Sequence, residues 1–205
     1  VFALKKYHHI VVEGTIGSGK TTLSEMLAHD LNAKLILERF ADNPFLPKFY
    51  KNPERYSFPL EMSFLADRFQ QFSEHLAQLD LFHEGFVADY HISKSLIFAK
   101  ATLGNDEFQL YRNLFAMMTK DLKAPDLYIY LMQTPDQLLR NIKKRGRSYE
   151  KNIQELYLKN IHQGYMEYLK IHSDWNVIKV DCSDLDYVER SADYRQLLQR
   201  IANQL

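Results

Sequence analysis

Short apolar runs alternate along the chain with longer segments in which apolar residues recur every three or four positions. This alternation is typical of α/β proteins, in which helices cover both faces of a buried parallel sheet. Strands are predicted at residues 9–13, 34–38, 85–89, 127–131 and 177–180. Helices are predicted at about residues 20–31, 57–81, 94–103, 107–122, 135–144 and 152–172, followed by a terminal helix. The pattern therefore predicts a three-layer α/β/α fold around a five-stranded parallel sheet.

Composition narrows the class of protein further. The chain has 205 residues, which is most simply one domain spanning residues 1–205. Lys+Arg and Asp+Glu number 26 each, so net charge does not indicate a nucleic acid or a membrane as partner. The one cysteine, Cys182, cannot form an internal disulfide, which favours a reducing, cytoplasmic setting. We expect a soluble protein acting on a small molecule.

The first strand runs into a glycine-rich segment, GTIGSGKTT, that fits the phosphate-binding pattern G-x-x-x-x-G-K-[ST]. In such a loop the backbone N–H groups turn around phosphate oxygens, the lysine reaches the β- and γ-phosphates, and the hydroxyl after it binds Mg²⁺. The motif favours nucleoside triphosphate binding but does not identify the acceptor. The candidate nucleotide-binding residues are Gly14, Thr15, Ile16, Gly17, Ser18, Gly19, Lys20, Thr21 and Thr22.

Two acids stand where predicted strands end. Glu38 closes the second strand and Asp89 the third, so both are expected at the edge of the sheet that carries the phosphate loop. A carboxylate there can accept a hydroxyl proton during phosphoryl transfer, and a second can assist the metal. The alternative for Glu38 is a solvated acid at a strand end.

The long helix carries Glu61 and Arg68, seven residues apart and about 10 Å along one face, with Leu65 and Phe72 on the same stripe. A carboxylate and a guanidinium on an apolar stripe can read the polar edge of a flat base. A surface ion pair is the alternative.

A basic segment follows the fourth strand. RNIKKRGRSYEKN, residues 140–152, places several cations around Gly146. Guanidinium groups on a mobile segment can close over the γ-phosphate and neutralise charge during transfer. The alternative is a solvated helix end whose basic residues complement the helix dipole.

These motifs, in this order, resemble the deoxynucleoside kinases, especially the bacterial deoxyadenosine/deoxyguanosine kinase-like branch. The resemblance runs from the phosphate loop through ERFADNPFLPKFYKNPERYSFPLEMSFL to KKRGRSYE. It implies a P-loop kinase fold, ATP and Mg²⁺, a homodimer, a role in nucleotide salvage, and a lid at about residues 140–150. By similarity, Glu38 is the base that activates the nucleoside 5′-hydroxyl. The resemblance also implies sugar contacts for Tyr50 and Glu150, pocket walls for Leu46 and Phe49, and lid arginines at Arg145 and Arg147.

The chain departs from the family pattern around the acceptor. Where the family has an acid, an arginine and a serine, this chain has Asp89, Tyr90 and His91. Glu61 replaces a glutamine that contacts the base, and because an ionised carboxylate only accepts hydrogen bonds, the recognition code has changed. An acid used in base recognition falls on Ser95. One lid arginine falls on Asn141, with Arg140 one place earlier.

The sequence predicts a kinase that moves the γ-phosphate of ATP to the 5′-hydroxyl of a deoxynucleoside. Glu38 would be the base, and Lys20, Arg145 and Arg147 would stabilise charge. Thr21 and Asp89 would hold Mg²⁺, and Lys94 would replace the missing arginine near the acceptor. Two alternatives stay open: a nucleotide-binding regulatory protein that has lost transfer, and a kinase for another small-molecule acceptor.

Overall fold

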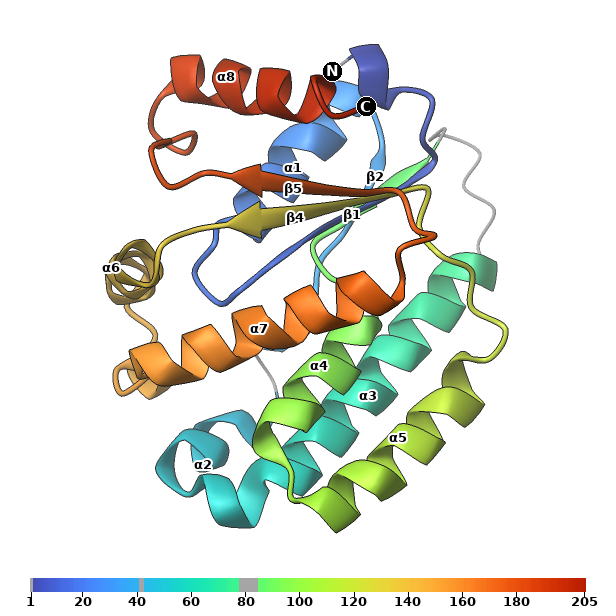
Figure 1. The fold of residues 1–205 in the computed structure, drawn as a ribbon, viewed down its shortest axis with the longest axis vertical. Coiled ribbons are helices and arrows are strands. Elements are labelled where there is room, and N and C mark those ends of the chain that lie inside the picture. Colours follow the sequence, from blue (N-terminus) through green and yellow to red (C-terminus); the bar gives the residue numbers. More distant parts are fainter. Residues whose placement is uncertain (1, 41–42, 78–84) are drawn as a thin grey trace.

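The computed structural model describes residues 2–40, 43–77 and 85–205, and its centre is a parallel sheet (Figure 1). The strands are β1 (His9–Gly14), β2 (Lys34–Ile36), β3 (Phe86–Ala88), β4 (Leu127–Met132) and β5 (Val177–Asp181). They pair in the order β2-β3-β1-β4-β5, and every pairing is parallel. The predicted five-stranded parallel sheet is confirmed.

Helices cover both faces of this sheet (Figure 1). On one face lie α1 (Lys20–Leu31) and α8 (Ser191–Ala202); on the other lie α4 (Ser93–Thr102) and α7 (Glu155–Ile171), with α3 (Pro53–Ala77) and α5 (Asn105–Thr119) beyond them. Near the carboxyl ends of β4 and β5 lies α6 (Pro135–Arg145). The remaining elements are η1 (Phe2–Leu4), α2 (Leu46–Lys51) and η2 (Ser148–Glu150). None of the helices in the described ranges is long and apolar enough to cross a membrane.

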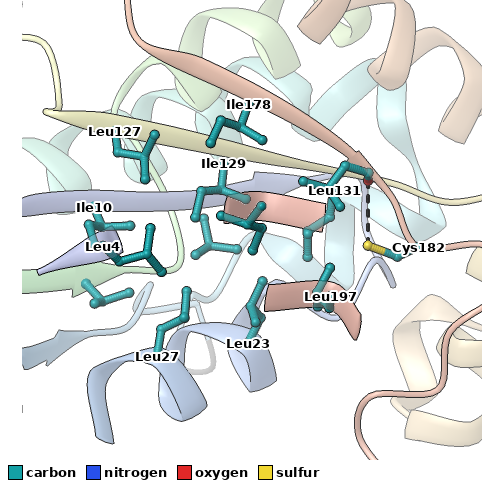
Figure 2. Close-up of a cluster of buried hydrophobic side chains, with 14 of the residues drawn as sticks. Leu4, Ile10, Leu23, Leu27, Leu127, Ile129, Leu131, Ile178, Cys182 and Leu197 are labelled. Carbon is teal, nitrogen blue, oxygen red and sulfur yellow. Dashed lines mark hydrogen bonds between the residues drawn. The ribbon is translucent and has the colours of Figure 1, made fainter. Parts of the chain in front are cut away.

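The two faces of the sheet have separate cores because successive strand residues point to opposite sides. Along β4, Leu127, Ile129 and Leu131 pack toward α1 and α8, in the cluster drawn in Figure 2. Tyr128 and Tyr130 pack toward α4 and α7. Cys182 lies in the first core, where its thiol donates to the Val180 carbonyl at 3.5 Å (Figure 2).

Most element boundaries differ from the prediction by one to three residues, as in α5 and α7, and three differences concern the site. Helix α3 begins at Pro53 rather than residue 57, because the Asn52 side chain accepts a hydrogen bond from the Arg55 amide at 3.3 Å and a proline suits a helix start. Its predicted end, residues 78–81, lies outside the described residues. β2 ends at Ile36 and β3 at Ala88, so Glu38 and Asp89 lie in the loops just beyond their strands.

The core that anchors α1 to the sheet predicts a stability effect. Leu23 is fully buried in the cluster between the sheet and the helices α1 and α8. Leu23→Ala should lower the free energy of unfolding by about 2–5 kcal/mol, because it removes apolar contacts and leaves a cavity. Urea unfolding followed by circular dichroism measures the change. Leu110→Ala is the matched control, since Leu110 on α5 is 52% exposed. A loss of stability in the control as large as in Leu23→Ala would contradict the assignment of this core.

Candidate active site

The glycine-rich segment forms a tight loop between β1 and α1. Gly17 and Gly19 have φ angles of 85° and 90°, which residues with a Cβ rarely adopt. Side chains from outside the loop hold its carbonyl groups: the Asn141 amide donates to the Gly17 carbonyl at 2.8 Å, and the Tyr187 hydroxyl to that of Ser18 at 3.0 Å. Because these two carbonyl groups are hydrogen-bonded to side chains outside the loop, the segment has the form of a phosphate-binding loop at the N-terminus of α1. Asn141, which falls at a lid arginine position, thus supports the loop.

The Asp89 carboxylate connects this loop to the acceptor side. Its Oδ2 accepts a hydrogen bond from the Thr21 hydroxyl at 2.6 Å, and its Oδ1 accepts one from the Glu38 backbone N–H at 2.7 Å. Asp89 is only 3% exposed. Mg²⁺ prefers oxygen ligands and is commonly held by one or two protein oxygens plus phosphates and water. The Thr21 and Asp89 oxygens fit that requirement, and no cluster of three or more metal-binding side chains occurs among the described residues.

The Glu38 carboxylate lies between two cations. Its Oε1 accepts hydrogen bonds from Arg68 Nε at 2.9 Å and Nη2 at 2.6 Å, and its Oε2 accepts one from Lys94 Nζ at 2.5 Å. The third nitrogen of the guanidinium, Arg68 Nη1, donates to the Ser95 hydroxyl at 2.7 Å. Burial raises the pKa of Glu38, but the charges of Lys94 and Arg68 outweigh it and hold this pKa well below the usual range. Glu38 is therefore an ionised carboxylate that can accept a proton or a hydrogen bond.

Two lysine ammonium groups, Lys20 and Lys94, lie near each other at the phosphate side of the site. Burial and then the charge of Lys94 lower the pKa of Lys20 to about 8. The two ammonium groups are thus close enough to disfavour each other, an arrangement that a polyphosphate anion would relieve.

Tyr90 and His91, at the positions where the family has arginine and serine, have structural roles here. Tyr90 packs on Ile36 and Ala88. The His91 backbone N–H donates to Glu13 Oε1 at 2.9 Å, and its ring meets Trp175 edge-on at 5.1 Å between centroids. Neither residue lines the cavity that contains Lys20, Glu38 and Asp89.

Glu13 is a buried residue that the sequence analysis missed. It is fully buried at the end of β1, where Oε2 also accepts a hydrogen bond from the Tyr165 hydroxyl at 2.8 Å. Burial raises its pKa, although Lys94 and Lys20 lower it. A lone acid inside an apolar strand was the available signal. Glu13 joins β1 to the segment after β3.

A single cavity brings the predicted residues together. The space inside it, together with the solvent-filled space at its mouth, is about 710 Å³. The predicted residues that line it are Ile16, Lys20, Thr21, Glu38, Leu46, Phe49, Tyr50, Glu61, Arg68, Asp89, Lys94, Arg145, Arg147 and Glu150. The other lining residues, which no sequence motif identifies, are Phe40, Leu60, Phe64, Phe98 and Tyr157. Charged groups and aromatic rings thus share one space, as a phosphorylated ligand with a flat ring requires.

The α3 wall of the cavity is only partly as predicted. Glu61 and Arg68 both line it, but Leu65 and Phe72 do not. At about 100° per residue, Leu65 lies about 140° around the helix from Leu60, which does line the cavity. Leu65 accordingly packs with Tyr111 and Phe115 of α5. Leu65 and Phe72 thus lie on the stripe that carries Glu61 and Arg68 but outside the cavity.

Glu61 is the least satisfied carboxylate in the cavity. It is 2% exposed, its Oε1 accepts a hydrogen bond from the Thr102 hydroxyl at 3.1 Å, and its Oε2 has no partner. Burial raises the pKa of Glu61 to about 7, although the charge of Arg68 lowers it. Both protonation states are therefore accessible near neutral pH.

The predicted lid is held by Glu150, which is 5% exposed. Its Oε2 accepts a hydrogen bond from Arg145 Nη2 at 2.6 Å, and its Oε1 accepts one from Arg147 Nη1 at 3.3 Å. The Arg147 guanidinium also lies over the Phe40 ring at 4.1 Å. Arg140 instead bonds Gln137 at 2.7 Å on the exposed side of α6, away from the cavity. Arg145 and Arg147 both line the cavity.

Comparisons with known proteins agree with this geometry. The deoxynucleoside kinase family model matches residues 10–205. A deoxyguanosine kinase of Bacillus subtilis (strain 168) is 36% identical over 92% of this chain and 93% of its own. A deoxyadenosine kinase of Dictyostelium discoideum is 35% identical over 94% of this chain and 77% of its own. The structure of deoxyadenosine kinase from M. mycoides with bound dATP has the same fold, with a TM-score of 0.79 at 24% identity over 94% of this chain and 98% of its own. The chain therefore belongs to the deoxynucleoside kinase family and is a phosphotransferase that acts on a deoxynucleoside hydroxyl.

Proposed function

We propose that this protein transfers the γ-phosphate of ATP to the 5′-hydroxyl of a purine deoxynucleoside, with Mg²⁺, in nucleotide salvage. The observation that carries the proposal is the Asp89 bridge, which joins the phosphate loop at Thr21 to the backbone of Glu38. The donor and acceptor sides of the cavity are thereby held at a fixed separation. The relatives named as deoxyguanosine and deoxyadenosine kinases support a purine acceptor.

Glu38 would align the 5′-hydroxyl and accept its proton. Phosphoryl transfer depends more on alignment and charge stabilisation than on the strength of the base. The hydrogen bonds from Arg68 and Lys94 fix the orientation of the Glu38 carboxylate and keep it ionised. Lys94 would also supply positive charge to the phosphoryl group in transit, the role of the arginine that this chain lacks.

Other lining residues have proposed roles at each end of the ligand. Leu46 and Phe49 would enclose the sugar and base, and Tyr50 and Glu150 would hold the 3′-hydroxyl. Lys20 would neutralise the β- and γ-phosphates, while Arg145 and Arg147 would close over the transferring group. Bound Mg²⁺ would stabilise charge on the phosphate oxygens, and Thr21 and Asp89 are the residues that would hold it.

The proposal extends to the whole molecule. Residues 1–205 would form one domain with a lid at about residues 140–150. By similarity to the family, the protein would act as a homodimer in the cytoplasm on a small-molecule substrate, without a nucleic acid or a membrane as partner.

Glu38→Gln tests the base. We expect kcat to fall about 10²–10⁴-fold, because the amide cannot take the hydroxyl proton. The affinity for ATP should be unchanged, since Glu38 is not part of the phosphate loop. ADP formation measures turnover, and calorimetry measures ATP binding. Glu54→Gln, at an exposed position in the first turn of α3, is the control. Full activity of Glu38→Gln would rule out this residue as the base.

Lys94→Ala tests the replacement of the missing arginine. The loss of a fixed charge beside the transferring group should lower kcat about 10²–10³-fold. Lys94→Arg should recover part of this loss, because it keeps the charge but changes the donor geometry. Lys100→Ala is the control on the same helix, where Lys100 forms an exposed ion pair with Glu167. The idea fails if Lys94→Ala leaves both turnover and nucleoside affinity intact.

Arg145→Ala tests the lid. A charge that acts mainly in the transition state should lower kcat about 10³-fold or more, with a much smaller effect on nucleoside binding. Steady-state kinetics and equilibrium binding separate the two effects. Arg140→Ala, on the exposed side of α6, should leave both unchanged. Equal losses in kcat and in nucleoside affinity would contradict a transition-state role.

A further inference from the structure

We propose that Glu61 selects the acceptor base, binding guanine as an ionised carboxylate that accepts hydrogen bonds from the ring N1–H and the 2-amino group. Deoxyguanosine would then be preferred to deoxyadenosine. The inference rests on the proposed function, since it assigns a specificity role within the same acceptor site.

The position of Glu61 supports this role. It lies in the wall of the cavity among aromatic side chains, including Phe49, Phe64 and Tyr157. These rings can enclose a flat base, and the buried Glu61 carboxylate in the same wall would then be available to its polar edge. Buried polar atoms are nearly always hydrogen-bonded. The unpartnered Oε2 of Glu61 therefore indicates that a ligand supplies a donor there.

The hydrogen-bonding pattern of the bases also favours guanine. A carboxylate is an acceptor at both oxygens, and each oxygen has two lone pairs. The Thr102 bond takes one lone pair of Oε1, which leaves Oε1 and Oε2 each able to accept a further bond. Guanine presents two adjacent donors, N1–H and the 2-amino group. Adenine places an acceptor, N1, beside its 6-amino donor, so one carboxylate oxygen would face a lone pair.

The nearby Arg68 guanidinium donates its hydrogen bonds to other groups. Arg68 directs Nε and Nη2 to Glu38 and Nη1 to Ser95. The Glu61 carboxylate has no hydrogen bond from Arg68 among those that the structure describes, although the charge of Arg68 favours its ionised form. The Glu61 carboxylate can therefore accept hydrogen bonds from the base.

The buried position of Glu61 also makes the base preference depend on pH. The pKa of Glu61 is raised to about 7 by burial. A protonated Glu61 donates through one oxygen and accepts through the other, which matches adenine N1 and its 6-amino group. Deoxyadenosine should bind better below this pKa and deoxyguanosine above it, so the preference for guanine rises with pH. The titratable groups that face Glu61 from the surrounding elements are Glu38, Tyr50, Arg68, Lys94, Tyr111 and Tyr157.

Calorimetry with a series of nucleosides tests the inference on the unmodified protein. Deoxyinosine lacks only the 2-amino group of deoxyguanosine, so it should bind about ten- to a hundred-fold more weakly, the usual effect of losing a hydrogen bond to a charged group. The ratio of deoxyguanosine to deoxyadenosine affinity should rise between about pH 6 and about pH 8. Comparing two nucleosides at one pH cancels titrations that affect both. 7-Deazadeoxyguanosine should bind as deoxyguanosine does, because N7 lies on the opposite edge.

Glu61→Gln is the matching variant and conserves side-chain volume. Its amide accepts at one end and donates at the other, so deoxyguanosine and deoxyinosine should bind alike, deoxyadenosine should gain, and the pH dependence of the ratio should disappear. Glu54→Gln on the same helix should behave as the unmodified protein.

Several outcomes would overturn the inference: equal binding of deoxyguanosine and deoxyinosine by the unmodified protein, a pH-independent ratio, loss of binding on 7-deaza substitution, or an unchanged preference in Glu61→Gln. Failure of the kinase proposal has a different signature. Nucleosides would bind in the expected order, but ATP and Mg²⁺ would yield no ADP. If none of the nucleosides binds, both proposals are wrong.

Discussion

The Glu38 carboxylate, buried between Lys94 and Arg68, is the interaction on which the acceptor site depends. Burying charges is unfavourable unless they are paired and hydrogen-bonded, and removing one partner leaves an uncompensated charge. Glu38 follows β2, Arg68 lies on α3 and Lys94 on α4, so this one cluster fixes three elements around the cavity. Asp89 then connects Glu38 to Thr21. The position of the acceptor is thus determined relative to the phosphate loop by short, charge-assisted contacts.

The segment after β3 is held along its length, which explains how the site tolerates its unusual sequence. Asp89 bonds Thr21, the His91 amide bonds Glu13, and Lys94 reaches Glu38. The positive charge near the acceptor therefore comes from the Lys94 side chain, in the first turn of α4, rather than from a residue at the end of β3. Lysine suits that longer path because its four-carbon stem is flexible, although it supplies a point charge and not a guanidinium fork.

Local patterns predicted much of this molecule, and long-range contacts account for what they missed. The phosphate loop and the parallel sheet follow from glycine spacing and apolar runs, which the sequence displays directly. Lys94, which bonds Glu38 Oε2, is 56 residues away from it, and Tyr165, which bonds Glu13 Oε2, is 152 residues away, so neither of these pairings is visible in a local pattern. The sequence did not identify Phe64 as a residue that lines the cavity. A helical stripe shows which residues share a face of the helix, but not which of them border a cavity.

The cavity has a charged end and an aromatic end, and its carboxylates differ in one respect. Glu38 is paired with Lys94 and Arg68, Glu150 with Arg145 and Arg147, and Asp89 accepts two hydrogen bonds. Among the described lining residues, Glu61 is the carboxylate with an unpartnered oxygen. At Glu61 the ligand sets the protonation state, because a two-donor edge stabilises the ionised form and a donor–acceptor edge stabilises the neutral one. Discrimination between bases thus follows from an acid that, among the described residues, receives no hydrogen bond from a cation.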